Sequence, residues 1–314
     1  MKKIVWLVYW FWLINLVYAS VPLKDATLTS APLTNVPFTN ALSEYVPIKI
    51  VTAENFYGEL SREVGGSYVE VHSIINNPNA DPHLFTTSPK VNQLLQEAQI
   101  IIYNGANYDP WIEQILSSLT NKSAIIINVA DLIGVNNGEN PHIWYKPQTF
   151  MVLAKQLASI IIKLNPKSKL YINQNLAYLL KQNLLVLQSI QDIKLHYNGI
   201  MVGATEPVFG YMASAMGLNM QGMDLQWKIM NNTEPSPQIL ANFEELLTKH
   251  QVKVIFYNSQ VVDAVVKNIL ELARQNHIPI VGISETMPSH LKVNQWLLNN
   301  ISATKSALQN SGKL

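Results

Sequence analysis

The chain has 314 residues, of which 48% are hydrophobic and 14% are charged, so it can bury one large core or two medium ones and is too apolar to be disordered. Its formal net charge is +1, and its charged residues form neither a basic patch that would bind nucleic acid nor an acidic run that would bind a polycation. It contains no cysteine, which excludes disulfides, thiolate metal ligands and thiol catalysis.

The first segment, MKKIVWLVYWFWLINLVYA, has two lysines, an apolar run from Ile4 to Ile14 and small residues near its end. This pattern is typical of a secretory signal peptide, and we expect cleavage after Ala19. An uncleaved membrane anchor is the alternative, although the run is shorter than the roughly 20 apolar residues that span a bilayer. A bacterial lipoprotein carries its acyl chain on a cysteine, so a chain without cysteine is expected to be a soluble periplasmic protein.

Residues 20–46 are rich in Pro, Thr, Ser and Ala, and we expect a flexible leader or, alternatively, an irregular segment that packs on the surface. From residue 47 to 165, short apolar runs alternate with helical patterns. The predicted strands are 47–53, 67–75, 99–106 and 123–130, and the predicted helices include 54–66, 90–98 and 109–119. This alternation predicts a βα lobe in which a parallel sheet is covered on both faces.

A long segment without glycine or proline, residues 167–194, follows Asn165-Pro166. Apolar residues recur along it at helical spacing, namely Leu176, Leu180, Leu184, Leu187 and Ile190. A helix of this length measures roughly 40 Å at 1.5 Å per residue. We predict one rigid linker helix over residues 166–194, with two ordinary helices as the alternative.

Beyond this helix the alternation of strands and helices resumes, which predicts a second βα lobe at residues 195–314. The predicted strands are 199–204, 252–258 and 278–284, and the predicted helices are 206–217, 235–250, 260–276 and 291–309. The fold class is therefore α/β, with two βα lobes, each built on a parallel four-stranded sheet, joined by a single long linker helix.

Polar side chains with metal-binding chemistry follow predicted strands in both lobes. In open parallel sheets, ligands bind beyond the carboxyl ends of the strands. The four candidates, each with a proline close by in the sequence, are His83, His142, Glu206 and Glu285. Two imidazoles and two carboxylates suit a divalent ion such as Zn²⁺ or Mn²⁺, so we predict a metal site in the cleft between the lobes.

These motifs also carry a family resemblance. From about residue 47 to its end, the chain resembles the metal-binding solute-binding proteins of bacterial ABC importers, and it contains in family order AENFYGEL, DPHLFTTSP, YNGANYDPWIEQIL, NPHIWYKP, TEPVFGYMASAMGL, NNTEPSP and IPIVGISETMP. The resemblance implies two βα lobes bridged by one long helix. It also implies delivery of zinc or manganese to a membrane permease. We expect a periplasmic monomer, and the scattered charges predict no nucleic-acid partner.

The resemblance assigns ligands residue by residue. The two histidine ligands of the family fall on His83 and His142, and the third ligand, which is His or Glu in different members, falls on Glu206. The fourth family ligand is usually Asp, whereas this chain offers Glu285 in the corresponding loop, with His290 as an alternative.

The sequence does not decide between zinc and manganese. Besides Glu285 in place of the usual Asp, the chain departs from the family pattern in a second way. Many zinc-specific members carry a histidine-rich loop between the first two ligands, but residues 84–141 contain no histidine. Zinc and manganese both fit the predicted ligand set. Three aromatic residues lie beside the ligands in the sequence, namely Trp144, Tyr145 and Phe209. We expect them either to exclude water from the site or to pack in the core. The histidines expected to be structural or solvated are His72, His196, His250 and His277.

Two other functions share parts of this pattern. A metal-dependent hydrolase could use the same side chains, but it would need an open coordination position and a general base, and the chain has neither a His-Glu-x-x-His nor a Gly-x-Ser-x-Gly motif. A chelate- or haem-binding protein would need basic residues in the cleft, whereas Arg62 and Arg274 are the only arginines and fall on predicted helices. The sequence therefore favours a non-enzymatic protein that binds a bare metal ion.

Overall fold

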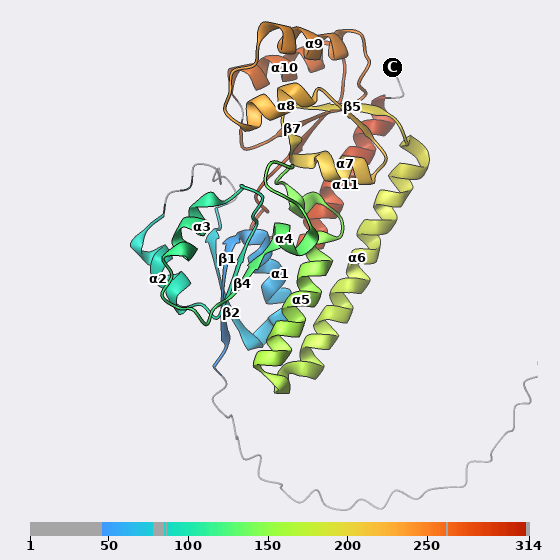
Figure 1. The fold of residues 1–314 in the computed structure, drawn as a ribbon. Helices are drawn as coiled ribbons and strands as arrows, with labels where there is room; N and C mark the ends of the chain where they lie inside the picture. The colour runs from blue at the N-terminus through green and yellow to red at the C-terminus, as the bar shows by residue number, and fades with distance from the viewer. Residues whose placement is uncertain (1–45, 78–84, 86, 262, 312–314) are drawn as a thin grey trace, which may run out of the picture. The chain divides into compact units, whose positions relative to one another are not determined.

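The computed structural model describes residues 46–77, 85, 87–261 and 263–311 (Figure 1). The predicted signal peptide, nearly all of the predicted leader and the candidate ligand His83 lie outside the described residues. In the described ranges, no helix combines the length and apolar character needed to cross a bilayer.

The first sheet is parallel and has the strand order β2-β1-β3-β4. Its central strands are rich in Ile and Val and are almost fully buried, as expected for a sheet covered on both faces. The strands are β1 (Ile48–Glu54), β2 (Val69–Ile75), β3 (Ile100–Tyr103) and β4 (Ile125–Asn128), and the helices are α1 (Asn55–Gly65), α2 (Pro89–Glu97), α3 (Pro110–Ser117), α4 (Val129–Ile133) and α5 (Thr149–Leu164).

The second sheet is also parallel and has the order β6-β5-β7-β8. Its strands are β5 (Met201–Ala204), β6 (Asn219–Gln221), β7 (Ile255–Asn258) and β8 (Ile280–Ile283), and its helices are α7 (Gly210–Ala215), α8 (Met223–Met230), α9 (Pro237–Thr248), α10 (Ala264–Gln275) and α11 (Val293–Ser311). β6 and α8 were not predicted from the sequence. A strand of three residues is too short to show a period in its side chains, so β6 becomes visible only through its pairing with β5.

The predicted long helix is confirmed as α6 (Lys169–Tyr197), which has 29 residues and follows a 3₁₀ turn, η4 (Pro166–Ser168). The predicted apolar face was right at Ile190 but wrong at Leu184 and Leu187, which are 53% and 43% exposed. The buried positions follow alternating steps of about three and four residues, namely Ile172, Leu179, Asn183, Val186, Ile190 and Ile193. At about 100° per residue, Leu187 lies about 100° and Leu184 about 160° around the helix from the buried Val186, so both leucines point away from the face that meets the neighbouring helices.

One apolar core connects the two sheets. Figure 1 shows α11 running alongside α6, and α5 packs against α6 as well. Trp296 of α11 stacks on Phe56 of α1 with ring centroids 5.7 Å apart, and it also contacts Tyr145 at 5.2 Å. The fold class predicted from the sequence is confirmed, while the lobe boundaries 47–165 and 195–314 remain predictions.

Candidate metal site

His142 immediately precedes the 3₁₀ helix η3 (Ile143–Tyr145) and is completely buried. Its Nδ1 lies 2.7 Å from Oδ1 of Asn140, and the same oxygen accepts the backbone N–H of His142 at 3.1 Å. Because that oxygen already acts as an acceptor, we assign the imidazole proton to Nδ1 and the lone pair to Nε2. Nε2 is therefore the atom with which His142 can bind a cation, and it lies 3.9 Å from Oε1 of Glu285.

Glu285 follows β8 and is only 2% exposed. Its Oε2 accepts a hydrogen bond from the Tyr108 hydroxyl at 2.8 Å, and its Oε1 accepts one from Nδ2 of Asn258 at 2.5 Å. Burial raises the pKa of Tyr108 well above its usual range, so this hydroxyl keeps its proton and remains a donor. The side chain of Gln260 fixes the backbone of the loop, because its Oε1 accepts the N–H of Glu285 at 2.6 Å.

Glu206 follows β5 and is 4% exposed. The next residue, Pro207, begins the 3₁₀ helix η5 (Pro207–Phe209), and its fixed φ sets the direction in which the chain leaves the strand. Asn140 also reaches this loop, since its Nδ2 donates to the carbonyl of Pro207 at 2.7 Å. One asparagine thus orients His142 and holds the residue beside Glu206.

Asn258 joins the two carboxylates. Its Nδ2 lies 2.5 Å from Oε1 of Glu285 and 3.4 Å from Oε2 of Glu206. The sheet order explains this position, because β7 lies between β5 and β8, and Asn258 is its last residue. Sequence reasoning missed Asn258, although its place at the carboxyl end of a predicted strand was a usable signal.

The distances bring two predicted ligands, His142 and Glu285, close together, and they connect the third, Glu206, to Glu285 through Asn258. Two ligand atoms about 2.1 Å from one tetrahedral ion lie about 3.4 Å apart. The 3.9 Å between Nε2 of His142 and Oε1 of Glu285 is close to that spacing, while Glu206 reaches the pair through Asn258. Among the residues that the structure describes, no group of three or more His, Cys, Asp or Glu side chains is gathered closely enough to hold an ion.

The aromatic residues beside these ligands are core residues. The His142 ring packs edge to face against Tyr108 and Trp144, with ring centroids 5.9 Å and 5.2 Å away. Trp144, Tyr145 and Phe209 are all buried within the main hydrophobic core. The two roles expected for them coincide, because side chains that pack in this core also exclude water from His142.

The remaining histidines lie away from this cluster. His290 is exposed, so the structure favours Glu285 over His290 as the fourth ligand. His72 lies on β2, where its Nε2 is 3.0 Å from Glu70 Oε1, and His196 is 3.5 Å from Asp192 on α6. Both arrangements are surface contacts of the kind expected from the sequence.

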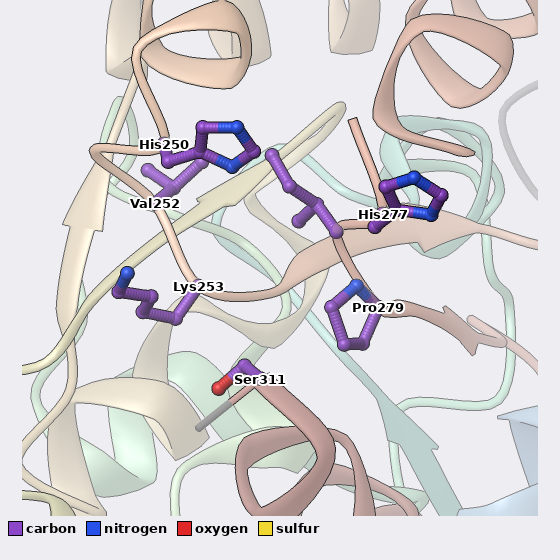
Figure 2. Close-up of a pocket in the computed structure, with 7 residues that line it drawn as sticks. His250, Val252, Lys253, His277, Pro279 and Ser311 are labelled. Atoms are coloured by element: carbon purple, nitrogen blue, oxygen red, sulfur yellow. The ribbon is translucent and has the colours of Figure 1, made fainter. Parts of the chain in front are cut away.

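A second region of the molecule contains two histidines, His250 and His277, which line a pocket with Lys253, Pro279 and Ser311 (Figure 2). These histidines follow α9 and α10, close to the amino ends of β7 and β8. Glu206 and Glu285 follow the carboxyl ends of β5 and β8, at the opposite edge of the sheet. The neighbouring ammonium group of Lys253 also makes this pocket a poor place for a metal cation.

Comparison with known proteins places this arrangement in a family. The ZnuA model, described as zinc-uptake complex component A, periplasmic, matches residues 50–304. The chain belongs to the ZnuA family. Members of this family are substrate-binding components of transport systems rather than enzymes. The matched range includes His83, His142, Glu206 and Glu285.

Curated relatives of the ZnuA-family chain are named as parts of metal transporters. It is 26% identical over 248 residues to the metal ABC transporter substrate-binding lipoprotein FimA of Streptococcus parasanguinis, a match that covers 74% of this chain and 78% of that protein. It is 26% identical over 251 residues to the manganese ABC transporter substrate-binding lipoprotein PsaA of Streptococcus pneumoniae, with the same coverage. Both relatives are named lipoproteins, whereas this chain contains no cysteine.

Solved structures confirm the fold. The periplasmic zinc-binding protein TroA of Treponema pallidum superposes with a TM-score of 0.68 at 18% identity, covering 84% of this chain and 99% of that one. A manganese-bound periplasmic metal-binding protein of Candidatus Liberibacter asiaticus gives a TM-score of 0.67 at 16% identity, covering 83% of this chain and 99% of that one. At these identities the likeness establishes the architecture of two sheets and one long helix.

Proposed function

We propose that this chain captures one Zn²⁺ or Mn²⁺ ion between the carboxyl ends of its two sheets and delivers it to an ABC-type permease. The proposed ligands are His83, His142, Glu206 and Glu285. The observation that carries the proposal is the buried approach of His142 to Glu285 across the two sheets, with Glu206 joined to them by Asn258. Membership of the ZnuA family and the metal-transporter names of its relatives support the same function.

The chemistry of the site suits capture of a cation. Glu206 and Glu285 are buried carboxylates that share an amide donor, and an amide N–H balances two negative charges far less well than a divalent ion does. An incoming ion would replace the contacts of Asn258 Nδ2 and draw the two carboxylates together with His142. We propose no catalytic role, because the donors that hold Glu285 are fixed groups that position it as a ligand.

Delivery requires a location outside the cytoplasm. Lys2 and Lys3, followed by an apolar run, support export through a signal peptide that is cleaved after Ala19. We propose that the mature chain acts in the periplasm as a monomer without a nucleic-acid partner. Its partner is the membrane permease of the importer, as implied by the names of its relatives.

The direct test of the proposed ligands is the double variant His83→Ala with His142→Ala. We expect the wild type to hold one equivalent of zinc or manganese after dialysis against a weak chelator, and the double variant to hold none, because half of the donor set is gone. Elemental analysis measures this stoichiometry. The matched control is His250→Ala with His277→Ala, which removes two exposed histidines near the other sheet edge. One tightly held equivalent in the His83 and His142 double variant would show that the site is elsewhere.

Metal affinity is expected to depend steeply on pH. An imidazole must be neutral to bind a metal, so protons compete with the ion. We therefore expect the affinity to fall as the pH is lowered from 8 to 5. Chelator competition at several pH values measures the slope, and His142→Ala should make it shallower. An affinity that stays constant across this range would exclude histidine ligands.

A further inference from the structure

Two buried carboxyl groups, those of Glu54 and Asp109, lie near the proposed metal site but are not among its proposed ligands. Glu54 is the last residue of β1, and Asp109 precedes α3 in the loop that follows β3. These strands are neighbours at the centre of the first sheet. Glu54 is 0% exposed and Asp109 is 2% exposed. The two carboxyl groups also affect each other electrostatically, and this needs an explanation, because a buried negative charge is unfavourable unless it is balanced.

Only one of the two carboxyl groups accepts hydrogen bonds from neighbouring N–H groups. Oδ2 of Asp109 accepts the backbone N–H of Asn104 at 2.7 Å, and Oδ1 accepts that of Gly105 at 2.9 Å. In the described part of the chain, neither Oε1 nor Oε2 of Glu54 has a hydrogen-bond donor. An ionised Asp109 is therefore well accommodated, whereas an ionised Glu54 would be a buried charge facing another of the same sign.

One proton bound between the two carboxyl groups would remove this repulsion. We propose that Glu54 is a neutral carboxylic acid that donates its proton to Asp109, and that this hydrogen bond fixes residues 104–109 behind the metal site. A protonated Glu54 no longer repels Asp109, and its O–H gives the aspartate a third donor. The proton belongs on Glu54 rather than on Asp109, because only Asp109 has N–H groups that stabilise a negative charge.

The groups that surround Glu54 favour the acid form. The titratable side chains that face it are Asp109, Tyr57 and Tyr108, and none of these is a cation. Burial raises the pKa of Glu54 well above its usual range, and the neighbouring Asp109 raises it further. Burial raises the pKa of Asp109 to about 6, against the lowering effect of the N–H groups of Asn104 and Gly105.

The loop of residues 104–109, which the Glu54–Asp109 pair holds, makes hydrogen bonds to residues at or beside two proposed ligands, His142 and Glu285. Asn104 donates through Nδ2 to the carbonyl of Pro141 at 2.9 Å, directly before His142. Tyr108 lies beside Asp109, and its hydroxyl donates to Glu285 at 2.8 Å. Glu54 is thus a positioning residue that acts through Asp109. This consequence for metal binding rests on the proposed function, whereas the protonation of Glu54 does not.

The protonation is tested on metal-free protein by infrared spectroscopy. We expect a carbonyl band of a protonated carboxylic acid that persists at pH 8 in the wild type and disappears in Glu54→Gln. Persistence of the band in Glu54→Gln, or its absence from the wild type, would overturn the proposal. Because no metal is present, this result does not depend on whether the metal site is correctly assigned.

Paired variants test which carboxyl carries the proton. Glu54→Gln keeps an N–H donor toward Asp109, so at pH 8, above the pKa of Asp109 of about 6, we expect a melting temperature no more than about 2 °C below that of the wild type. Asp109→Asn loses a charged acceptor of two backbone N–H groups and should melt at least about 3 °C lower. The reverse order of the two variants would place the proton on Asp109 and contradict the proposal.

The pH profile of Glu54→Gln gives a readout that a purely structural role would not produce. The pKa of Glu54 is raised in the folded state, so its favourable contribution is complete below the unfolded value of about 4.5 and declines as pH rises toward the folded value. The melting temperature of Glu54→Gln relative to the wild type should therefore increase from pH 5 to pH 9. A difference that decreases over this range would mean that Glu54 functions as a carboxylate.

The positioning role is tested by metal affinity. We expect Glu54→Gln to bind zinc within about 3-fold of the wild type and Glu54→Leu to bind at least about 10-fold more weakly, because leucine offers Asp109 no donor. Wild-type affinity in both variants would exclude the positioning role while leaving the infrared result intact. A loss in Glu54→Gln equal to that in Glu54→Leu would contradict the donor role of Glu54.

Discussion

Replacing Glu285 with glutamine is expected to lower the affinity for Zn²⁺ by at least about 100-fold. Loss of a group that merely supports a metal ligand typically lowers affinity about 10- to 100-fold, so loss of a carboxylate ligand should have at least the upper effect. Glutamine has nearly the same shape, and Glu285 is held by Tyr108 and Asn258 in a fully packed environment. The variant should therefore fold normally, and chelator competition measures the change in affinity.

Two controls make this result specific. Glu271→Gln removes a carboxylate of the same type from α10, where its side chain is 59% exposed and contacts Arg274, and its affinity should match the wild type. His290→Ala tests the alternative fourth ligand and should also match the wild type, because His290 is exposed. If Glu285→Gln binds within about 3-fold of the wild type while His290→Ala loses binding, the fourth ligand is His290.

The second large effect is expected from Trp296→Ala, which should lower the free energy of unfolding by about 3–5 kcal/mol. Trp296 is 2% exposed, stacks on Phe56 and contacts Tyr145. Its indole N–H also donates to Oγ of Ser284, next to Glu285, at 3.2 Å. The substitution leaves a cavity where α11 meets the first lobe, and urea denaturation of the metal-free protein measures the loss.

An exposed aromatic residue supplies the control for Trp296. Tyr178 on α6 is 62% exposed, and Tyr178→Ala should change the free energy of unfolding by no more than about 0.5 kcal/mol. If Trp296→Ala changes it by less than about 1 kcal/mol, the two sheets do not share the continuous core described above.

Much of the fold follows from local patterns in the sequence. The runs that form β1, β3, β7 and β8 are short, apolar and bounded by polar loops, so their existence is visible without knowledge of their neighbours. The order of the strands is not visible in this way, because pairing depends on contacts between distant segments. Asn258 ends a predicted strand and could have been singled out for that reason, but its contacts with Glu206 and Glu285 depend on the strand order and are visible only in the structure.

The supporting residues of the site show the same limit. His142, Glu206 and Glu285 were recognisable as ligand types in loops after strands. The structure places His142 beside Glu285 and connects Glu206 to Glu285 through Asn258. Tyr108, Asn140 and Gln260 act through hydrogen bonds whose partners lie far away in the sequence or depend on the turn of a loop. No periodicity marks such residues. For α6 the sequence showed the helix itself, but not which of its faces would meet α5 and α11.

Anomalous diffraction from crystals of the metal-loaded protein, recorded at the zinc and manganese absorption edges, locates the bound ion directly. We expect one strong anomalous peak per chain, within about 2.3 Å of donor atoms of His83, His142, Glu206 and Glu285. The edge at which the peak appears identifies the metal. A peak at another place, such as the pocket lined by His250 and His277, with no metal beside His142 and Glu285, would contradict the account.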